Sequence, residues 1–391
     1  MLSSPPLALY VHFPWCVRKC PYCDFNSYTL HGALPAREYV DLLLRDLARR
    51  APGAGGRALI SVFLGGGTPS LFPAEAIGRV LEGARALIGL EPDVEVTLEA
   101  NPGTIERGRF AEYRAAGVNR VSLGAQSFDP QRLRALGRIH TPDDTRRAAD
   151  ELHAAGLHNF NLDLMYALPG QDLGGALADL EAALALQPAH LSHYQLTLEP
   201  GTVFAAERPE LPEDDAAADM LSACEARLGA AGFSQYEVSA YARTGRRARH
   251  NCNYWTFGDY IGIGAGAHGK LTDPGQGHIL RTRQTREPRR YLASGVPEPV
   301  TEPVAPQDLP FEFLMNALRL SEGFALPLFE SRTGLKRDAI VPTLSSLQAD
   351  GLLVGDTESW RTTRLGARFL NEVLLRFLPE GREGDPRRVS T

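Results

Sequence analysis

The hydrophobic residues of the first 235 positions follow two periods that alternate along the chain. Short apolar runs rich in Val, Ile and Leu are each followed by a stretch in which apolar residues recur every three or four positions. Runs of the first kind are typical of strands buried on both faces, and the longer stretches are typical of amphipathic helices. The pattern predicts six strands, over residues 7–13, 58–64, 94–98, 120–123, 160–166 and 191–198.

Helical periods follow each of these strands. They predict helices over residues 36–50, 74–88, a stretch that ends near Gly117, 130–136, 142–155, 176–186 and 215–231. Consecutive strands joined by helices must lie parallel, and right-handed crossovers curl such a sheet toward a barrel. Six units are two fewer than the eight of a closed barrel. We therefore predict an α/β fold, an incomplete (β/α)6 barrel over residues 1–235.

The pattern changes beyond residue 235. The segment 236–306 holds a basic stretch, the motif HNCNYW and the glycine-rich string IGIGAGAHGK, and its part from Thr272 to Pro306 is rich in Pro, Gly and Arg. That composition predicts a long connection. Helical periods then return over residues 311–320, 327–333, 336–350 and 365–377, with a possible hairpin of residues 352–354 and 360–362. We expect a smaller, mostly helical, winged-helix-like domain over 307–378 and a disordered tail over 379–391.

Three of the five cysteines lie together directly after the first predicted strand. Cys16, Cys20 and Cys23 form the motif C-x3-C-x2-C. Thiolates at this spacing can hold three irons of a [4Fe–4S] cluster and leave the fourth iron open to a small molecule. The alternatives are a zinc site with His12 as fourth ligand, a disulfide that leaves one odd thiol, and thiols that are merely buried.

Composition narrows the setting in which the protein works. The chain has 43% hydrophobic and 23% charged residues, as soluble globular proteins do, and a net charge of −6 that gives no reason to expect nucleic acid as a partner. We find no signal peptide and no run of eighteen uninterrupted apolar residues. Bunched cysteines favour a reducing compartment, so we expect a cytoplasmic protein.

Polar residues stand at the carboxyl ends of the predicted strands, where parallel barrels bind their ligands. A run of three glycines, residues 65–67, follows the second strand, and Glu99, Gln126 and Asp163 mark the third, fourth and fifth. Each has an ordinary explanation, because glycine runs form turns and carboxylates cap helices. Together they favour a nucleoside-sized cofactor beside the cysteines.

These motifs resemble those of the radical S-adenosylmethionine (SAM) superfamily. The cysteine motif, GGGTP and the six strand–helix units carry this likeness, and the strings YVHFPWC, FLGGGTPS, LEANPG, GAQSF and DLMYALPGQ resemble the oxygen-independent coproporphyrinogen III oxidase group, within it the HemW-type heme chaperones. The resemblance implies a [4Fe–4S] cluster on Cys16, Cys20 and Cys23, with SAM on its open iron. It implies SAM contacts at Tyr10, Tyr22, Gly66, Gly67, Thr68, Glu99, Gln126, Arg138 and Asp163.

Two features distinguish this chain from the decarboxylating oxidases of that group. Phe25 stands where their motif has a fourth cysteine, and the first predicted strand already begins at Leu7. The HNxNYW signature of the heme chaperones is present, and its histidine, the heme ligand favoured in that family, is His250. The resemblance implies a chaperone that transfers heme to an acceptor hemoprotein, such as a respiratory enzyme, and meets a membrane only through that acceptor. The alternative is oxidative decarboxylation of coproporphyrinogen III by a 5′-deoxyadenosyl radical.

The residues around this signature have suitable chemistry for heme. A neutral imidazole is a good axial ligand, and Tyr254 and Trp255 can pack on a porphyrin face. Propionates can pair with the nearby Arg243, Arg246, Arg247 and Arg249. The alternative is a solvated basic loop beside a core histidine. Other candidate ligands are His268, His190, His193 and Cys252, whereas Cys224 has helical spacing to leucines and is expected in the core.

Overall fold

The computed structural model describes residues 1–104 and 109–378, and the predicted strands form the centre of its twelve-stranded sheet. Six strands pair in parallel in chain order: β1 (Leu7–Phe13), β4 (Leu59–Gly66), β5 (Leu90–Ala100), β6 (Arg120–Gln126), β7 (Phe160–Tyr166) and β8 (His190–Gln195). The predicted incomplete (β/α)6 barrel is thereby confirmed.

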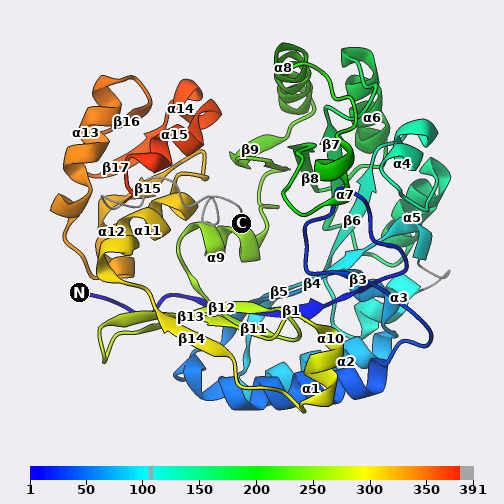
Figure 1. Cartoon of the computed structure of the whole chain (residues 1–391), viewed down its shortest axis with the longest axis horizontal. Coiled ribbons are helices and arrows are strands. Elements are labelled where there is room, and N and C mark those ends of the chain that lie inside the picture. Colours follow the sequence, from blue (N-terminus) through cyan, green and yellow to red (C-terminus); the bar gives the residue numbers. More distant parts are fainter. Residues whose placement is uncertain (105–108, 379–391) are drawn as a thin grey trace.

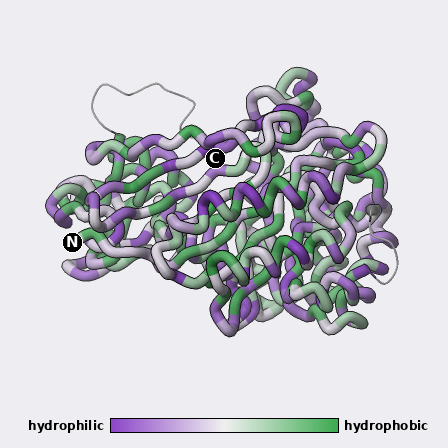
Figure 2. The backbone as a smooth tube through the Cα atoms, turned by 90° about the horizontal axis from the view of Figure 1, so that it is seen from below, coloured by the Kyte–Doolittle hydropathy of each residue, from purple (hydrophilic) through white to green (hydrophobic). Residues whose placement is uncertain are grey.

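Helices follow these strands where the apolar period predicts them. They are α1 (Ala36–Arg50), α2 (Ala74–Leu87), α3 (Arg109–Ala115), α4 (Pro130–Ala135), α5 (Pro142–Ala154), α6 (Leu173–Ala185) and α8 (Asp214–Ala230). In α1, Val40, Leu43 and Leu47 are fully buried at helical spacing beneath the strands. Hydrophilic and hydrophobic segments alternate along the backbone throughout Figure 2, as amphipathic elements require.

The segment from Thr272 to Pro306 is not the long connection that its composition predicts. Strand β11 (Asp259–Ile263) pairs in parallel with β1 and adds a seventh parallel strand, and β12 (His268–Asp273), β13 (His278–Arg283) and β14 (Val300–Pro303) extend the sheet in antiparallel fashion. Helix α10 (Pro288–Ala293) lies in the same segment. The prediction was wrong because Pro274, Gly275 and Gly277 form the turn between β12 and β13, and most of the other Pro and Gly residues lie between the elements or at their ends.

The opposite edge of the sheet and the C-terminal part complete the fold. The edge consists of β10 (Ala240–Ala242) and β9 (Ser234–Glu237), which continue antiparallel from β8. In the C-terminal part, the predicted hairpin of β16 (Leu353–Gly355) and β17 (Ser359–Thr362) is confirmed, and β15 (Phe324–Ala325) joins it. The helices there are α11 (Leu309–Ala317), α12 (Leu326–Thr333), α13 (Val341–Ala349), α14 (Arg364–Arg368) and α15 (Leu370–Leu375).

These C-terminal elements have a hydrophobic core of their own. Phe313, Phe329 and Leu344 are fully buried in it, and Phe257 joins it from the segment before β11. Figure 1 shows these elements, gold to red, on one side of the molecule, with α9 (Arg249–Trp255) between them and the barrel. The boundaries at residues 235 and 306 stay a prediction, and the expected tail over 379–391 lies outside the described residues.

The strands of the barrel have one apolar and one polar face. On β5, Val96 and Leu98 belong to the main hydrophobic core, whereas Glu95, Thr97 and Glu99 lie on the other face. That second face lines the interior, since Tyr10 of β1 stacks on Phe63 of β4 at 6.0 Å between ring centroids and Phe63 pairs in register with Thr97. The interior of the barrel is therefore the place to look for a polar site.

Candidate functional site

The cysteine motif lies on a loop that side chains fasten at several points. The loop runs between the two short parallel strands β2 (Trp15–Cys16) and β3 (Tyr28–Thr29). Lys19 Nζ donates to the carbonyl oxygens of Phe25 at 2.9 Å and Ser27 at 3.1 Å, and Asn26 Nδ2 donates to those of Ala265 at 3.1 Å and Arg286 at 3.0 Å. The loop is thus attached to the sheet through residues more than 230 positions away.

All three cysteines on this loop are free and half-buried. Burial raises the pKa of the Cys16 thiol to about 11 and also raises the pKa of Cys23, so both are protonated in the absence of a metal. Metal binding requires thiolates and therefore releases these protons. Arg138 brings a guanidinium to the site, and its Nη1 lies 3.7 Å from Cys20 Sγ. In the described ranges no three Cys, His or carboxylate side chains are already arranged as a metal site.

His12, the fourth ligand of the zinc alternative, is already engaged on both ring nitrogens. Its Nδ1 lies 2.7 Å from Tyr10 Oη, and its Nε2 lies 2.9 Å from the carbonyl oxygen of Asn26. Burial lowers the pKa of His12 to about 4, so the ring is neutral and fixes the loop to β1. A zinc site on these cysteines would lack the ligand predicted for it.

The glycine run packs directly against the cysteine loop. Gly66 has φ +114°, and a Cβ on it would lie 2.4 Å from the His12 ring. A Cβ on Gly67 would lie 2.6 Å from the carbonyl oxygen of Trp15, because the Gly67 amide donates to the carbonyl of Phe13 at 2.7 Å. These two positions accept only glycine on steric grounds. The close approach brings the carboxyl ends of β1 and β4 together around the cysteines.

Two carboxylates sit deep at the same end of the barrel. Glu99 Oε2 accepts one hydrogen bond, from the Gly66 amide at 2.9 Å, and burial raises the pKa of Glu99 to about 8 with a further contribution from Asp163. Burial also raises the pKa of Asp163, although Asn161 and Ser122 donate to it at 2.7 and 3.1 Å. A cation placed between these carboxylates would restore their charge. The site therefore fits a ligand that carries an amine and hydroxyl groups, as SAM does.

Gln126 and Arg138 close the site on the β6 side. Gln126 has φ 65° next to an irregularity in the pairing of β6 with β7, and its Oε1 accepts from Tyr194 Oη at 2.8 Å. Left-handed backbone at a non-glycine residue stores strain that is typical of functional sites. Arg138 Nη2 donates to the carbonyl of Gly124 at 2.6 Å, and its buried Nε has no partner among the described residues. Tyr22 packs against the ring of Phe204 at 6.3 Å.

His250 lies at the other end of the barrel. It is on α9, is 5% exposed, and packs against Phe63 with ring centroids 4.3 Å apart and the ring planes tilted by 36°. Its Nδ1 lies 2.7 Å from Glu95 Oε1, and Glu95 precedes Glu99 by four residues, about 13 Å along a strand. The structure therefore does not bring His250 to the cysteines.

The His250 ring is nevertheless oriented as a metal ligand would be. Burial lowers the pKa of His250, so the neutral ring donates Nδ1–H to the ionised Glu95 and keeps a lone pair on Nε2. Carboxylates orient metal-binding histidines by accepting the proton of the second ring nitrogen in this way.

Most of the other residues considered for heme already have partners. Arg243 lies over the Phe233 ring at 4.6 Å, Arg247 pairs with Glu322 at 2.7 Å, and Arg249 pairs with Asp93 at 2.8 Å. Four more candidates are packed or paired inside the protein: Trp255 lies under Arg319, Tyr254 packs on Tyr260, His193 stacks on Tyr166, and His190 bonds to Asn161 and Tyr236. Cys224 is in the core as predicted, Cys252 is a half-buried free thiol, and Arg246 and His268 are exposed.

The barrel interior also contains polar residues around Asp163 that the sequence motifs did not indicate. Ser122, Asn161 and Ser192 surround Asp163 or its partners, and His190, which the sequence indicated only as an alternative heme ligand, bonds to Asn161. The available signal was the alternation of β7, where Asn161 and Asp163 flank the buried Leu162. A strand buried on both faces has little reason to place two polar residues on the same face unless they line a polar interior.

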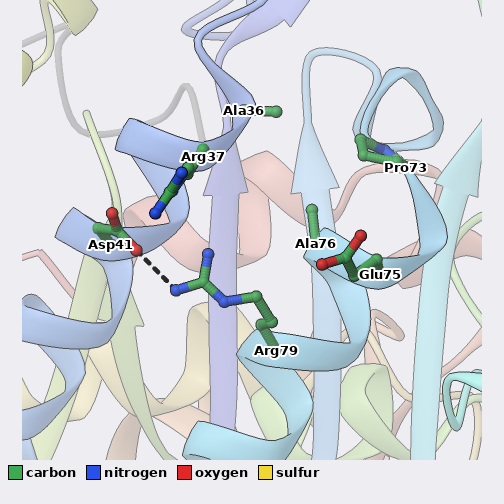
Figure 3. Close-up of a pocket in the computed structure, with 7 residues that line it drawn as sticks. All are labelled: Ala36, Arg37, Asp41, Pro73, Glu75, Ala76 and Arg79. Atoms are coloured by element: carbon green, nitrogen blue, oxygen red, sulfur yellow. Dashed lines mark hydrogen bonds and ion pairs between the residues drawn. The ribbon is translucent and has the colours of Figure 1, made fainter.

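A surface pocket lies elsewhere, between α1 and α2. It has a volume of about 470 Å³ and is lined by Ala36, Arg37, Asp41, Pro73, Glu75, Ala76 and Arg79. Figure 3 shows the ion pair of Arg79 with Asp41 that crosses it. None of the predicted cofactor residues lines this pocket. None of the described helices is long and apolar enough to cross a bilayer.

Comparison with known proteins gives the fold and the family. The Radical SAM superfamily matches residues 10–183, and the HemN C-terminal domain matches residues 304–369. The solved structure of coproporphyrinogen III oxidase (HemN) from Escherichia coli superimposes with a TM-score of 0.81 at 23% identity, covering 96% of this chain and 90% of that one. That likeness establishes the fold.

Closer sequence relatives cover nearly the whole chain. The heme chaperone HemW of Escherichia coli is 50% identical over 97% of this chain and 100% of its own length. The HemW of Mycobacterium tuberculosis is 37% identical over 96% of both chains, and the mouse mitochondrial radical S-adenosyl methionine domain-containing protein 1 is 37% identical over 100% of this chain and 91% of its own. The chain therefore belongs to the HemW family of the radical SAM superfamily.

Proposed function

We propose that this protein is a heme chaperone, which binds heme and delivers it to an acceptor hemoprotein. One observation carries the proposal: a chain that is 50% identical to a protein named a heme chaperone holds the histidine of its HNCNYW helix neutral and oriented, with Nε2 left to bind iron. The acceptor is expected in the cytoplasm or at a membrane-bound respiratory enzyme that the chaperone meets from the cytoplasmic side.

The cofactor set is proposed from the carboxyl end of the barrel. Cys16, Cys20 and Cys23 would hold a [4Fe–4S] cluster, which supplies one-electron chemistry toward SAM when both are bound. SAM would be contacted by Tyr10, Tyr22, Gly66, Gly67, Thr68, Glu99, Gln126, Arg138 and Asp163. Several of these residues are prearranged for such a ligand: Glu99 lacks a cation, Asp163 is oriented by its donors, and Arg138 retains a free Nε.

Heme binding requires α9 to change its packing. His250 is 5% exposed and its ring lies against Phe63, so a porphyrin cannot reach Nε2 while that contact persists. Glu95 can keep its bond to Nδ1 during such a movement only if α9 and the carboxylate move together, because Glu95 also accepts from the amides of Arg249 and His250. We therefore propose that heme enters beside α9 after the helix separates from Phe63.

The test is an anaerobic titration of the cluster-reconstituted protein with hemin, followed by Soret absorbance. We expect a saturating Soret band in the wild type and an affinity weaker by about tenfold or more in His250→Ala, because an axial bond is lost. His268→Ala is the control, since it removes an exposed histidine on β12, outside α9. No saturable band in the wild type, or equal weakening in both variants, would contradict the proposal.

The second candidate function is the decarboxylation of coproporphyrinogen III, which the structural likeness to HemN favours. The two functions differ in product. Incubation with coproporphyrinogen III, SAM and a reductant under anaerobic conditions should leave the substrate unchanged if the protein is a chaperone. Formation of protoporphyrinogen at many turnovers per protein would instead support the enzyme. Phe25, exposed where the oxidases have their fourth cysteine, is a feature of this chain that argues against turnover.

A further inference from the structure

A row of buried polar side chains crosses the barrel interior and begins at Asp163. Asn161 Nδ2 donates to Asp163 Oδ1 at 2.7 Å and to Ser122 Oγ at 2.8 Å, and Ser122 Oγ donates to Asp163 Oδ2 at 3.1 Å. Both oxygens of the carboxylate are thus held from β6 and β7. Reversing the Asn161 amide would place its oxygen against the carboxylate, so its orientation is determined.

His190 holds the other end of the Asn161 amide. His190 Nδ1 lies 2.7 Å from Asn161 Oδ1, which also accepts from Ser192 Oγ at 3.2 Å. Because a carbonyl oxygen can only accept, the ring proton of His190 is on Nδ1. Burial lowers the pKa of His190 well below its usual value, so the ring is neutral and Nε2 is an acceptor. Asn161 has every hydrogen-bonding position filled.

Tyr236 carries the row to the amino end of α9. His190 Nε2 accepts from Tyr236 Oη at 2.9 Å, and Tyr236 Oη accepts from the amide of Ala248 at 3.4 Å. Ala248 is the residue that precedes α9, the helix that carries His250. A backbone amide and a carboxylate terminate the row, so all its donors point from α9 toward Asp163. Buried networks of this kind have few alternative arrangements, because any unpaired member costs the full desolvation of a polar group.

The two ends of this row lie at two different sites with proposed functions. One end is the carboxylate proposed to contact SAM, and the other is the start of the helix that must move for heme to reach His250. We propose that Asn161 and His190 are positioning residues that couple the binding of SAM at Asp163 to the position of α9 against the barrel. The inference rests on the proposed function, since it takes Asp163 as a SAM contact. Linkage then requires that SAM and heme change each other's affinity by the same factor.

The experiment measures hydrogen exchange of the α9 backbone in the full chain with its cluster reconstituted, with and without SAM. We expect SAM to change the exchange rates of residues 249–255 by about threefold or more, because the helix start is part of the row that SAM orders. Tyr236→Phe removes only the hydroxyl that joins His190 to Ala248 and should abolish the change. Tyr291→Phe is the matched control: its hydroxyl is equally buried, donates to Asp46 Oδ2 at 3.1 Å, and lies outside the row.

Two further variants separate positioning from a purely structural role. His190→Gln keeps one donor and one acceptor and should retain the SAM response, whereas His190→Phe keeps neither and should lose it. They also decide the matter if Tyr236→Phe does not fold. The inference is overturned if SAM leaves α9 exchange unchanged in the wild type, or changes it equally in Tyr236→Phe and His190→Phe.

Equilibrium dialysis with SAM on the same samples identifies which idea fails. SAM that binds without any response in α9 contradicts the coupling and leaves the proposed cofactor site standing. Absence of SAM binding overturns both the site at Asp163 and the coupling built on it. Hemin is not needed for this measurement, so its outcome is independent of the titration that tests the heme chaperone.

Discussion

Glu95 and Glu99 are two carboxylates on one face of one strand, and their surroundings differ completely. Glu95 accepts from the amides of Arg249 and His250 and from the His250 ring, and these bonds outweigh burial and lower its pKa to about 2. In the part of the chain that the structure describes, Glu99 accepts from the Gly66 amide alone, and burial raises its pKa to about 8. The first carboxylate is satisfied by the protein itself, whereas the second lacks a partner that a ligand can supply.

This difference gives the two residues opposite effects on stability. The folded pKa of Glu95 lies below its ordinary value of 4.5, so its contribution is present above about pH 4.5 and is lost as the pH falls toward about 2. The folded pKa of Glu99 lies above 4.5, so its protonated form is favourable at low pH and the folded state loses stability as the pH rises toward about 8. Near neutral pH Glu95 therefore stabilises the fold, whereas Glu99 destabilises it and would gain from a bound cation.

The largest expected effect is the loss of the cluster from the carboxyl end. Cys16→Ser should abolish iron and sulfide binding after anaerobic reconstitution, because only two thiolates remain to hold it. Cys252→Ser on α9 is the matched control and should retain full iron and sulfide. Both variants should unfold at the wild-type temperature without the cluster. Full retention of iron in Cys16→Ser would show that another residue holds the cluster.

The matched substitutions Glu95→Gln and Glu99→Gln test the comparison itself. Glu95→Gln should lower the free energy of unfolding at neutral pH by about 2 kcal/mol, since its amide group would face three donors. Glu99→Gln should instead raise it by up to about 3 kcal/mol, because the amide removes the cost of protonating a carboxyl group that is ionised in the unfolded state at that pH. Urea unfolding monitored by circular dichroism measures both. Equal losses in the two variants would remove the distinction between the ends of the barrel.

The pH dependence of SAM binding sharpens the same contrast. A cation binds Glu99 only when the carboxyl group is ionised, so the SAM affinity of the cluster-loaded protein should fall on the order of tenfold from pH 7.5 to pH 6.5. Glu99→Gln should bind SAM weakly and with little dependence on pH over that interval. Equilibrium dialysis gives both affinities. A wild-type affinity that rises on acidification would exclude Glu99 as the cation partner.

The sequence predicts the barrel well because each of its strands and helices has a recognisable pattern of apolar residues. The segments 7–13, 36–50 and 160–166 match β1, α1 and β7 residue for residue. The failure at Thr272 to Pro306 has a physical cause, since Pro and Gly in a hairpin turn look the same as Pro and Gly in a loop. Strands β12 to β14 are held by pairing with one another and with β11, and this pairing between strands is not visible as a pattern of apolar residues within any one segment.

The site was predictable only in part, for a related reason. Residues at the ends of consecutive parallel strands must converge, so Glu99 and Asp163 could be placed near the cysteines from topology alone. The position of the His250 ring could not be predicted, because it depends on a hydrogen bond to Glu95, which is 155 positions away. The same is true of His190, whose partners Asn161 and Tyr236 come from two other strands.

The smallest expected effect concerns a charged pair outside the barrel. Arg79 and Asp41 form an ion pair of 2.6 Å across the surface pocket of Figure 3, and their side chains are 38% and 43% exposed. Exposed pairs gain little from Coulomb attraction in water, so Arg79→Gln should change the free energy of unfolding by less than about 0.5 kcal/mol and leave SAM and hemin affinities unchanged. Urea unfolding and the two binding measurements check this. A large change in either affinity would mean that ligand binding depends on the outer helices as well as on the barrel interior, and the contrast between Glu95 and Glu99 would then describe only part of the site.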